Sequence, residues 1–186
     1  MYKFFLILMT FGNLFSNAQS IYSRTVDSNA SITIFTNSDT IAIGDSHCEV
    51  YAMILNEDCL NYYTLSYLFK APKSLYLSSR YILRTRFEDG EVYDFKNINE
   101  DRFFNEGSEV EFRILVEKYQ LYKMRAVAIT SVRFLRDEFK YDILIHYPYA
   151  NKIPDLVDFI LKLDVYKAYN SPEKPAETNH IPLPEN

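Results

Sequence analysis

One short segment groups several side chains that can do chemistry, Asp45-Ser46-His47-Cys48-Glu49. A thiol beside an imidazole is the pairing found in nucleophilic enzymes, and both groups also bind zinc. Neighbouring residues of an extended chain point to opposite faces, however, so His47 and Cys48 are not expected to meet. The sequence offers no further ligands at a metal-binding spacing. We therefore interpret the segment as a polar turn before a strand, and assign no metal site and no catalytic residue.

Three arginines recur on one face of an expected strand, Arg80, Arg84 and Arg86. Guanidinium groups held on a rigid sheet can clamp a carboxylate, a sulfate or a phosphate. The same side chains can instead pair across strands with acidic neighbours such as Asp94 and keep a sheet edge soluble. We name these arginines as the candidate ligand-binding residues and keep cross-strand pairing as the alternative.

Carboxylates and tyrosines offer two further patterns. Glu109 and Glu111 share a strand face, but without a cleft they resemble a solvated face more than the acid pair of a glycosidase. Tyr62, Tyr63 and Tyr67 follow one another on a strand and could stack against a sugar. The chain has no Trp, and Tyr is common in the core of sheets, so we favour a core role for these tyrosines.

The chain has two cysteines, Cys48 and Cys59. A disulfide requires their Cα atoms to lie within about 7 Å of each other. The expected hairpin turn at residues 56–58 places Cys59 opposite a residue near Leu55, which argues against the bond. Export from the cytoplasm would favour it, so the disulfide stays open at this point.

Composition excludes several functions. With only four Gly in the chain, we find no phosphate-binding loop, no dinucleotide fingerprint and no Gly-x-Ser-x-Gly elbow. We therefore expect no cofactor. The formal net charge of −5 argues against a protein that neutralises the phosphates of nucleic acid.

The N-terminal residues 1–18 have the pattern of a secretory signal peptide. Lys3 precedes an apolar run over residues 4–9, and small residues ending at Ala18 follow. A helix that spans a bilayer needs about 20 apolar residues, more than this run contains. We expect cleavage after Ala18 and export to the periplasm or the medium, with no transmembrane segment in the mature chain.

The mature chain is expected to form one α+β domain. We predict a flexible leader at residues 19–29, the domain at residues 30–166, and a disordered tail rich in Pro and Glu at residues 167–186. Strands joined by short turns predict a mostly antiparallel sheet covered by two helices. A β-sandwich is the alternative if the first helix is only one turn long.

Periodicity places the elements of this domain. Residues 31–36 and 40–43 predict a hairpin, and Asp89-Gly90 predicts a second one between residues 80–87 and 92–95. Residues 108–116 alternate strictly between apolar and polar, as expected of a strand with one buried face. Helical spacing is found at residues 117–126 and 154–166, and further strands are expected at residues 48–55, 62–69, 129–135 and 139–147.

The stretches FEDGEVYDF and FRILVEKYQLYKMRAVAITSVRFL, together with the signal pattern, resemble small exported β-rich proteins of unknown function from Bacteroidota-type bacteria. The similarity spans residues 62–163. It implies an exported, β-rich protein and provides no catalytic residues.

These observations favour a non-catalytic binding or interaction module of the cell envelope. Its expected partner is an envelope or extracellular macromolecule or a glycan. One alternative is a hydrolase with an unrecognised site at His47, Cys48 or the arginine strand. The other is a periplasmic immunity or inhibitor protein whose acidic surface neutralises a basic toxin.

Overall fold

The computed structural model describes residues 20–26, 31–43, 47–136 and 139–170. The expected signal peptide lies outside these residues, as does most of the expected tail. Of the helices in the described ranges, none is long and apolar enough to cross a membrane.

The main element is an antiparallel sheet, here called the large sheet. Its strands follow the order β1-β2-β4-β5-β10, and β3 pairs with β4 beside β2. Long central strands give it its size, since β4 and β5 pair without interruption from Cys48↔Phe69 to Glu57↔Leu60. The bounds are β1 (Ile21–Val26), β2 (Ile32–Thr36), β3 (Asp39–Ala42), β4 (Cys48–Glu57), β5 (Leu60–Lys70) and β10 (Glu109–Val116).

Two smaller sheets complete the β structure. The second sheet has the order β12-β11-β7-β8 and is also antiparallel. The third is a two-stranded ribbon of β6 and β9. The bounds are β6 (Leu75–Leu77), β7 (Ile82–Phe87), β8 (Val92–Lys96), β9 (Arg102–Phe104), β11 (Ile129–Arg136) and β12 (Phe139–Leu144).

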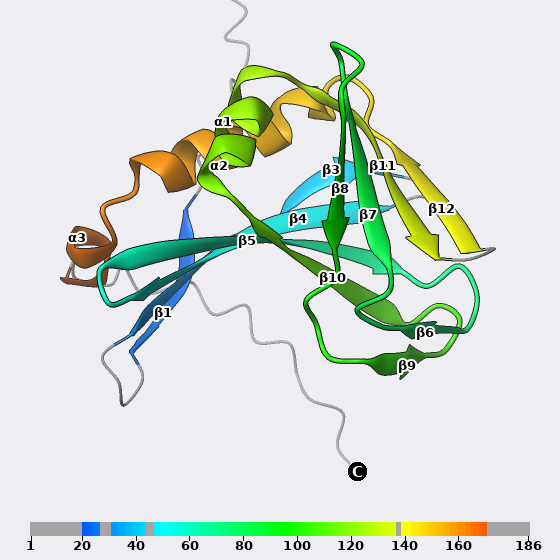
Figure 1. Ribbon diagram of the computed structural model, residues 1–186, viewed down its shortest axis with the longest axis horizontal. Helices are drawn as coiled ribbons and strands as arrows, with labels where there is room; N and C mark the ends of the chain where they lie inside the picture. The colour runs from blue at the N-terminus through cyan, green and yellow to red at the C-terminus, as the bar shows by residue number, and fades with distance from the viewer. Residues whose placement is uncertain (1–19, 27–30, 44–46, 137–138, 171–186) are drawn as a thin grey trace, which may run out of the picture.

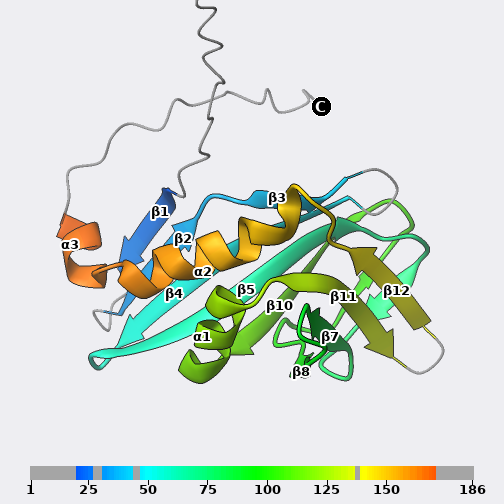
Figure 2. The ribbon, with the colours of Figure 1, turned by 90° about the horizontal axis from the view of Figure 1, so that it is seen from above.

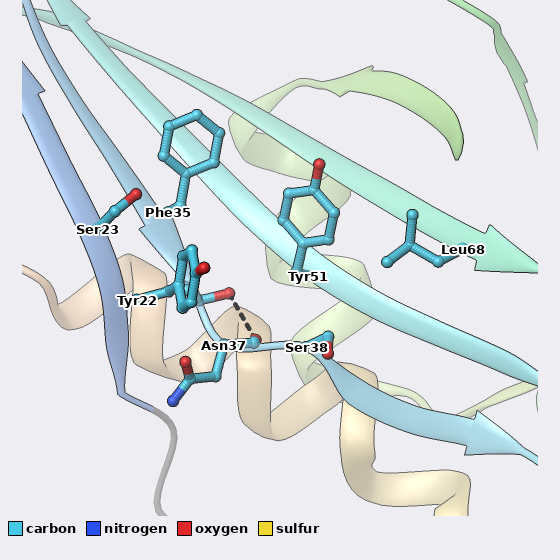
Figure 3. A pocket seen from close by; sticks show the side chains of 8 residues that line it. Tyr22, Ser23, Phe35, Asn37, Ser38, Tyr51 and Leu68 are labelled. Atoms are coloured by element: carbon cyan, nitrogen blue, oxygen red, sulfur yellow. Dashed lines mark hydrogen bonds between the residues drawn. The ribbon is translucent and has the colours of Figure 1, made fainter. Parts of the chain in front are cut away.

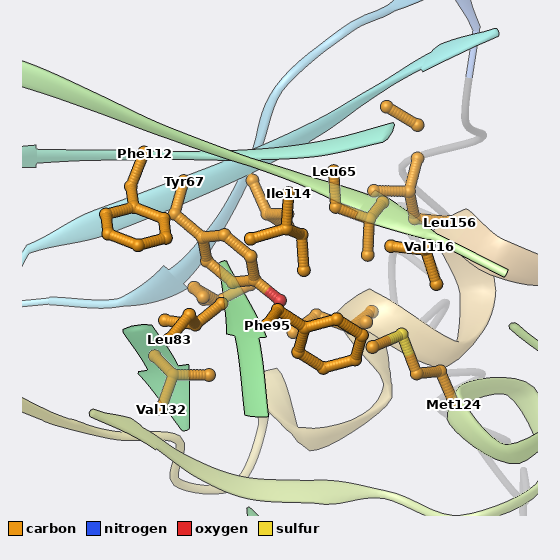
Figure 4. Close-up of a cluster of buried hydrophobic side chains, with 14 of the residues drawn as sticks. Leu65, Tyr67, Leu83, Phe95, Phe112, Ile114, Val116, Met124, Val132 and Leu156 are labelled. Carbon is orange, nitrogen blue, oxygen red and sulfur yellow. The ribbon is translucent and has the colours of Figure 1, made fainter. Parts of the chain in front are cut away.

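One face of the large sheet is covered by two different layers (Figures 1 and 2). The second sheet covers one half of it, and the helices α1 (Lys118–Ala126) and α2 (Lys152–Lys162) cover the other half. A short helix, α3 (Val165–Asn170), follows α2. The core lies between these layers, because apolar side chains of all three parts meet there, among them Tyr67, Phe112, Leu83, Val132, Met124 and Leu156 (Figure 4).

The opposite face of the large sheet, here called the outer face, has no helix against it among the described elements (Figure 1). Among the described elements, the ribbon of β6 and β9 and the segment between β8 and β9 border it at one end. The alternation of β10 assigns residues to the two faces: Val110, Phe112 and Ile114 are buried, and Glu111 and Arg113 point outward. The outer face is therefore a surface of regular strands that the described structure leaves accessible.

The expected fold class is confirmed in part. The chain is mostly antiparallel sheet, and both expected helices are present, at α1 and α2. They cover only half of the large sheet, because the second sheet packs on the other half as in a β-sandwich; the rings of Phe69 and Phe134 meet there at 4.4 Å. The Asp89-Gly90 hairpin is confirmed as β7–β8, with Gly90 at φ +89°.

Three local expectations need correction. The segment expected to be a flexible leader contains β1, which pairs with β2 over Ile21↔Thr36 to Val26↔Ile32. The strands β2 and β3 do not form a hairpin with each other, because β4 is ten residues long and pairs with both in turn. The last helix is not continuous to residue 166: α2 ends at Lys162, and α3 extends past the expected end of the domain.

Candidate functional site

A polar row crosses the centre of the outer face. Tyr51 on β4 lies opposite Ser66 on β5, and Ser66 lies opposite Arg113 on β10. Glu111 is two residues before Arg113 and therefore on the same face of β10. Cross-strand pairing thus brings four polar side chains from three adjacent strands together, and we call them the Glu111 network.

One carboxylate oxygen is the centre of this network. Glu111 Oε1 accepts hydrogen bonds from Tyr51 Oη at 2.5 Å, from Ser66 Oγ at 2.7 Å and from Arg113 Nη2 at 2.5 Å. Arg113 also donates to Ser66 Oγ at 3.1 Å and to Tyr51 Oη at 3.3 Å. Glu111 Oε2 has no hydrogen-bond partner within the described ranges, so one acceptor of the network remains available.

The network keeps each group in its ordinary charge state. Burial alone would raise the pKa of Glu111, but hydrogen bonds from Tyr51, Ser66 and Arg113 outweigh it and lower that pKa. Burial would lower the pKa of Arg113, but its contacts with Glu111 and Tyr51 raise it. Burial and the bond to Glu111 raise the pKa of Tyr51. At neutral pH the network is therefore a carboxylate, a guanidinium and a neutral phenol.

Two cavities adjoin this network. The first, of about 720 Å³, is lined mainly by Tyr22, Phe35, Tyr51 and Leu68, with polar atoms at its rim from Asn37 and Ser38 (Figure 3). The rings of Phe35 and Tyr51 lie 6.5 Å apart and are tilted by 44°.

The second cavity, of about 660 Å³, is also lined by Tyr51 and Leu68. Because the two cavities share these residues, they lie side by side on the outer face, and together they are here called the outer groove. Its second half is strongly charged, with the side chains of Glu100, Asp101, Arg102, Glu109, Glu111 and Arg113.

A segment that follows β8 forms one wall of the charged half. The backbone N–H of Ile98 donates to the carbonyl of Arg113 at 2.9 Å, and Asn99 Nδ2 donates to the carbonyl of Glu111 at 2.8 Å. Asp101 accepts from Tyr76 Oη at 3.3 Å and from the backbone N–H of Ser79 at 3.2 Å. The bonds of Ile98 and Asn99 hold the wall against the edge of β10, and those of Asp101 hold it against β6 and the turn that follows β6.

The candidate arginines lie elsewhere. Arg84 and Arg86 point outward from β7 in the second sheet, and Arg80 lies in the turn before that strand. Arg84 makes a two-pronged pair with Asp94, with Nε to Oδ1 at 2.8 Å and Nη2 to Oδ2 at 2.7 Å. For Arg84 the structure therefore shows the cross-strand pairing that was the alternative, and none of the three arginines lines the outer groove.

The other sequence candidates are also dispersed. Cys48 is buried in the core, whereas His47 is exposed and contacts Glu49 at 3.3 Å. Tyr63 and Tyr67 belong to the core as expected, and Tyr62 is 42% exposed. Across the described residues, no three His, Cys, Asp or Glu side chains are close enough to hold a metal ion.

The structure contains no bond between the cysteines; both are free. Cys59 lies in the two-residue turn of the β4–β5 hairpin, and Cys48 pairs with Phe69 at the other end. Nine strand steps separate the two ends, which is about 30 Å. The distance excludes the disulfide within this fold.

Sequence reasoning missed the Glu111 network. Glu111 was interpreted as part of a solvated face, yet its side chain is 31% exposed and has three donors. Glu and Arg at positions i and i+2 of a strand with one buried face are a weak local signal. The partners Tyr51 and Ser66 follow only from the register of three strands.

Comparison of the chain with protein-family models, with curated proteins and with solved structures finds no match. The site must therefore be interpreted from its own geometry.

Proposed function

We propose that the protein is an exported, non-catalytic binding module whose ligand occupies the outer groove. The observation that supports this most directly is that two adjacent cavities share Tyr51, beside a hydrogen-bonded network that leaves Glu111 Oε2 available. Concave sites that combine apolar walls with a few fixed polar groups are the usual form of ligand sites.

The electrostatics of the network favour binding over catalysis. A general acid or base works best when its pKa lies near the working pH. Here the pKa of Glu111 is lowered and those of Tyr51 and Arg113 are raised, so all three move away from neutrality. A network that neither takes up nor releases protons near neutral pH suits recognition of a ligand.

The rigidity of the site supports the same function. Tyr51, Ser66 and Glu111 belong to β4, β5 and β10, which are paired along their whole lengths. Sites built on paired strands hold their side chains more precisely than sites on loops. A ligand would therefore meet a surface whose hydrogen-bonding pattern already exists.

Export is part of the proposal and depends on the sequence pattern of residues 1–18. It is tested by isolating the protein from cell fractions and determining its N-terminus. A chain that begins at Gln19 in the periplasm or the medium supports export, and a full-length chain in the cytoplasm contradicts it.

Binding is tested by NMR titration of the ¹⁵N-labelled mature chain with soluble basic peptides, glucosamine oligomers and neutral oligosaccharides. We expect at least one probe to shift amide signals around Tyr51, Ser66 and Glu111, and Tyr51→Ala to weaken that binding by about tenfold or more. Tyr147→Ala is the matched control, because Tyr147 is 92% exposed and lies outside the groove. Failure of all probes to bind, or equal binding by Tyr51→Ala, contradicts the proposed site.

A further inference from the structure

We propose that the outer groove, if it is the binding site, holds an extended cationic stretch of a partner polypeptide. An apolar side chain of the partner lies beside Phe35 and Tyr51, and a lysine or arginine lies near Glu100 and Glu109. The inference rests on the proposed function and adds the chemistry of its ligand.

Charge is the first argument. The second half of the groove has four carboxylates and two guanidiniums. Arg113 is already paired with Glu111, and the guanidinium of Arg102 lies over the ring of Phe104 at 5.5 Å. Glu100 and Glu109 have no ion pair within the described ranges. This half of the groove therefore has an excess of negative charge, which a cation on the ligand would neutralise.

The shape of the other half is the second argument. Its aromatic rings are tilted by 44° to each other and do not form a flat platform for a sugar ring. With Leu68 they line an angular apolar cavity, which suits a branched or aromatic side chain. At the rim, Asn37 Nδ2 donates to Ser20 Oγ and Ser38 Oγ donates to Glu49 Oε2 at 2.6 Å, so the side-chain oxygens of Asn37 and Ser38 are the groups that can accept from a peptide N–H.

Spacing connects the two halves. Phe35 on β2 is in register with Leu115 on β10, three strand-to-strand steps away, which is about 14 Å. Glu111 lies four residues farther along β10, which adds about 13 Å along the strand, so Phe35 and Glu111 are about 20 Å apart. An extended peptide advances about 3.3 Å per residue, so it covers this distance in about six residues. Side chains at positions i and i+6 of an extended chain point to the same side. The groove therefore matches a segment with an apolar residue and a basic residue six positions apart.

The test is isothermal titration calorimetry with the peptide acetyl-Phe-Thr-Ser-Thr-Ser-Thr-Lys-amide. We expect the variant with both Glu100→Gln and Glu109→Gln to bind it about fivefold more weakly than the unmodified protein at physiological salt. The variant with Glu88→Gln and Glu106→Gln has the same net charge, and both of its changes are exposed and outside the groove. It should bind like the unmodified protein. Replacing the lysine of the peptide by norleucine should remove the difference between the two variants.

Two results overturn the inference and leave the proposed function intact. In the first, Tyr51→Ala weakens binding of the peptide, but the two glutamine variants bind the peptide with equal affinity. The other is binding of a glucosamine oligomer at the groove while the peptide fails to bind. If Tyr51→Ala changes the binding of no probe, the proposed function itself fails, and with it the inference.

Discussion

Arg113 donates a hydrogen bond to the phenolic oxygen of Tyr51 at 3.3 Å, although 62 positions separate them in the chain and their strands are not neighbours. The strand between them, β5, presents Ser66 at this point. Its side chain is small enough for the two long side chains to meet above it, and it is fully buried as a result. Both long side chains also donate to Glu111. The small residue on the middle strand therefore allows Tyr51, Arg113 and Glu111 to contact one another.

Glu111→Gln is expected to lower the free energy of unfolding by about 1–2 kcal/mol. The change removes the negative charge that pairs with Arg113, while both groups are largely shielded from solvent at 31% and 25% side-chain exposure. Denaturant unfolding followed by circular dichroism measures the effect. Glu109→Gln is the matched control on the same face of the same strand, and it should change stability by less than about 0.5 kcal/mol. Equal effects of the two changes would show that the network does not stabilise the fold.

The stabilisation from Glu111 is expected to disappear in acid. Its pKa in the folded protein lies below the ordinary value of 4.5, so the unfolded chain takes up the proton first. The stabilisation is therefore complete above about pH 4.5 and is lost as the pH falls through the folded-state pKa. Asp89 beside Lys123 and Asp94 beside Arg84 also have lowered pKa values, so the unmodified protein loses stability at several sites.

Comparing the stability of the unmodified protein with that of Glu111→Gln at each pH isolates the contribution of Glu111 from those of Asp89 and Asp94. Unfolding measured at several pH values from about 7 to 3 should show a stability difference that narrows in acid. If the difference in free energy of unfolding between the two proteins stays constant down to the lowest pH, the negative charge of Glu111 does not stabilise the fold.

Local patterns predicted the elements whose evidence lies in neighbouring residues. The alternation of β10 and the Asp89-Gly90 turn both depend on a few consecutive residues, and both are confirmed. The edge strand β1 was missed because Ser23, Arg24 and Thr25 give it no apolar face. Its pairing with β2 stabilises it as a strand, together with the packing of Ile21 against the core.

Pairing between distant strands was the part that the sequence did not reveal. The hairpin assigned to β2 and β3 failed because both strands had a better partner in β4, which is long enough for two. The Glu111 network depends on the same kind of information. The contact between Tyr51 and Arg113 can be inferred only from the exact pairing registers of β4, β5 and β10.

The arginine strand is expected to be dispensable for binding in the groove. Arg84→Ala removes an exposed pair with Asp94, so the unfolding midpoint and the affinity for groove ligands should both stay close to those of the unmodified protein. Arg113→Ala should weaken binding and lower the midpoint, because it leaves Glu111 without its cation. Thermal unfolding and the NMR titration measure both variants. The original assignment of the arginines as ligand-binding residues would regain support if Arg84→Ala abolished binding of a probe.

The two thiols are expected to differ sharply in reactivity. Cys48 has no exposed surface, and burial together with the nearby charge of Glu49 raises the pKa of its thiol. Cys59 is exposed in its turn. Because the thiolate is the reactive form, iodoacetamide should modify Cys59 in the folded protein and Cys48 only after denaturation. Intact mass spectrometry before and after denaturation counts the labels. Rapid labelling of both thiols in the folded protein would contradict the buried position of Cys48.

Cys59→Gly is expected to stabilise the protein by about 0.5–1 kcal/mol. The β4–β5 turn has positive φ at both central residues, +49° at Asp58 and +64° at Cys59. A two-residue turn of this kind favours glycine at its second position, because a Cβ atom there is strained. Cys59→Ala keeps the Cβ atom and loses the same contact of the thiol with Tyr166, so it is the matched control and should give no gain. Denaturant unfolding of both variants measures the difference, and equal stability of the glycine and alanine variants would show that the turn is not strained at this position.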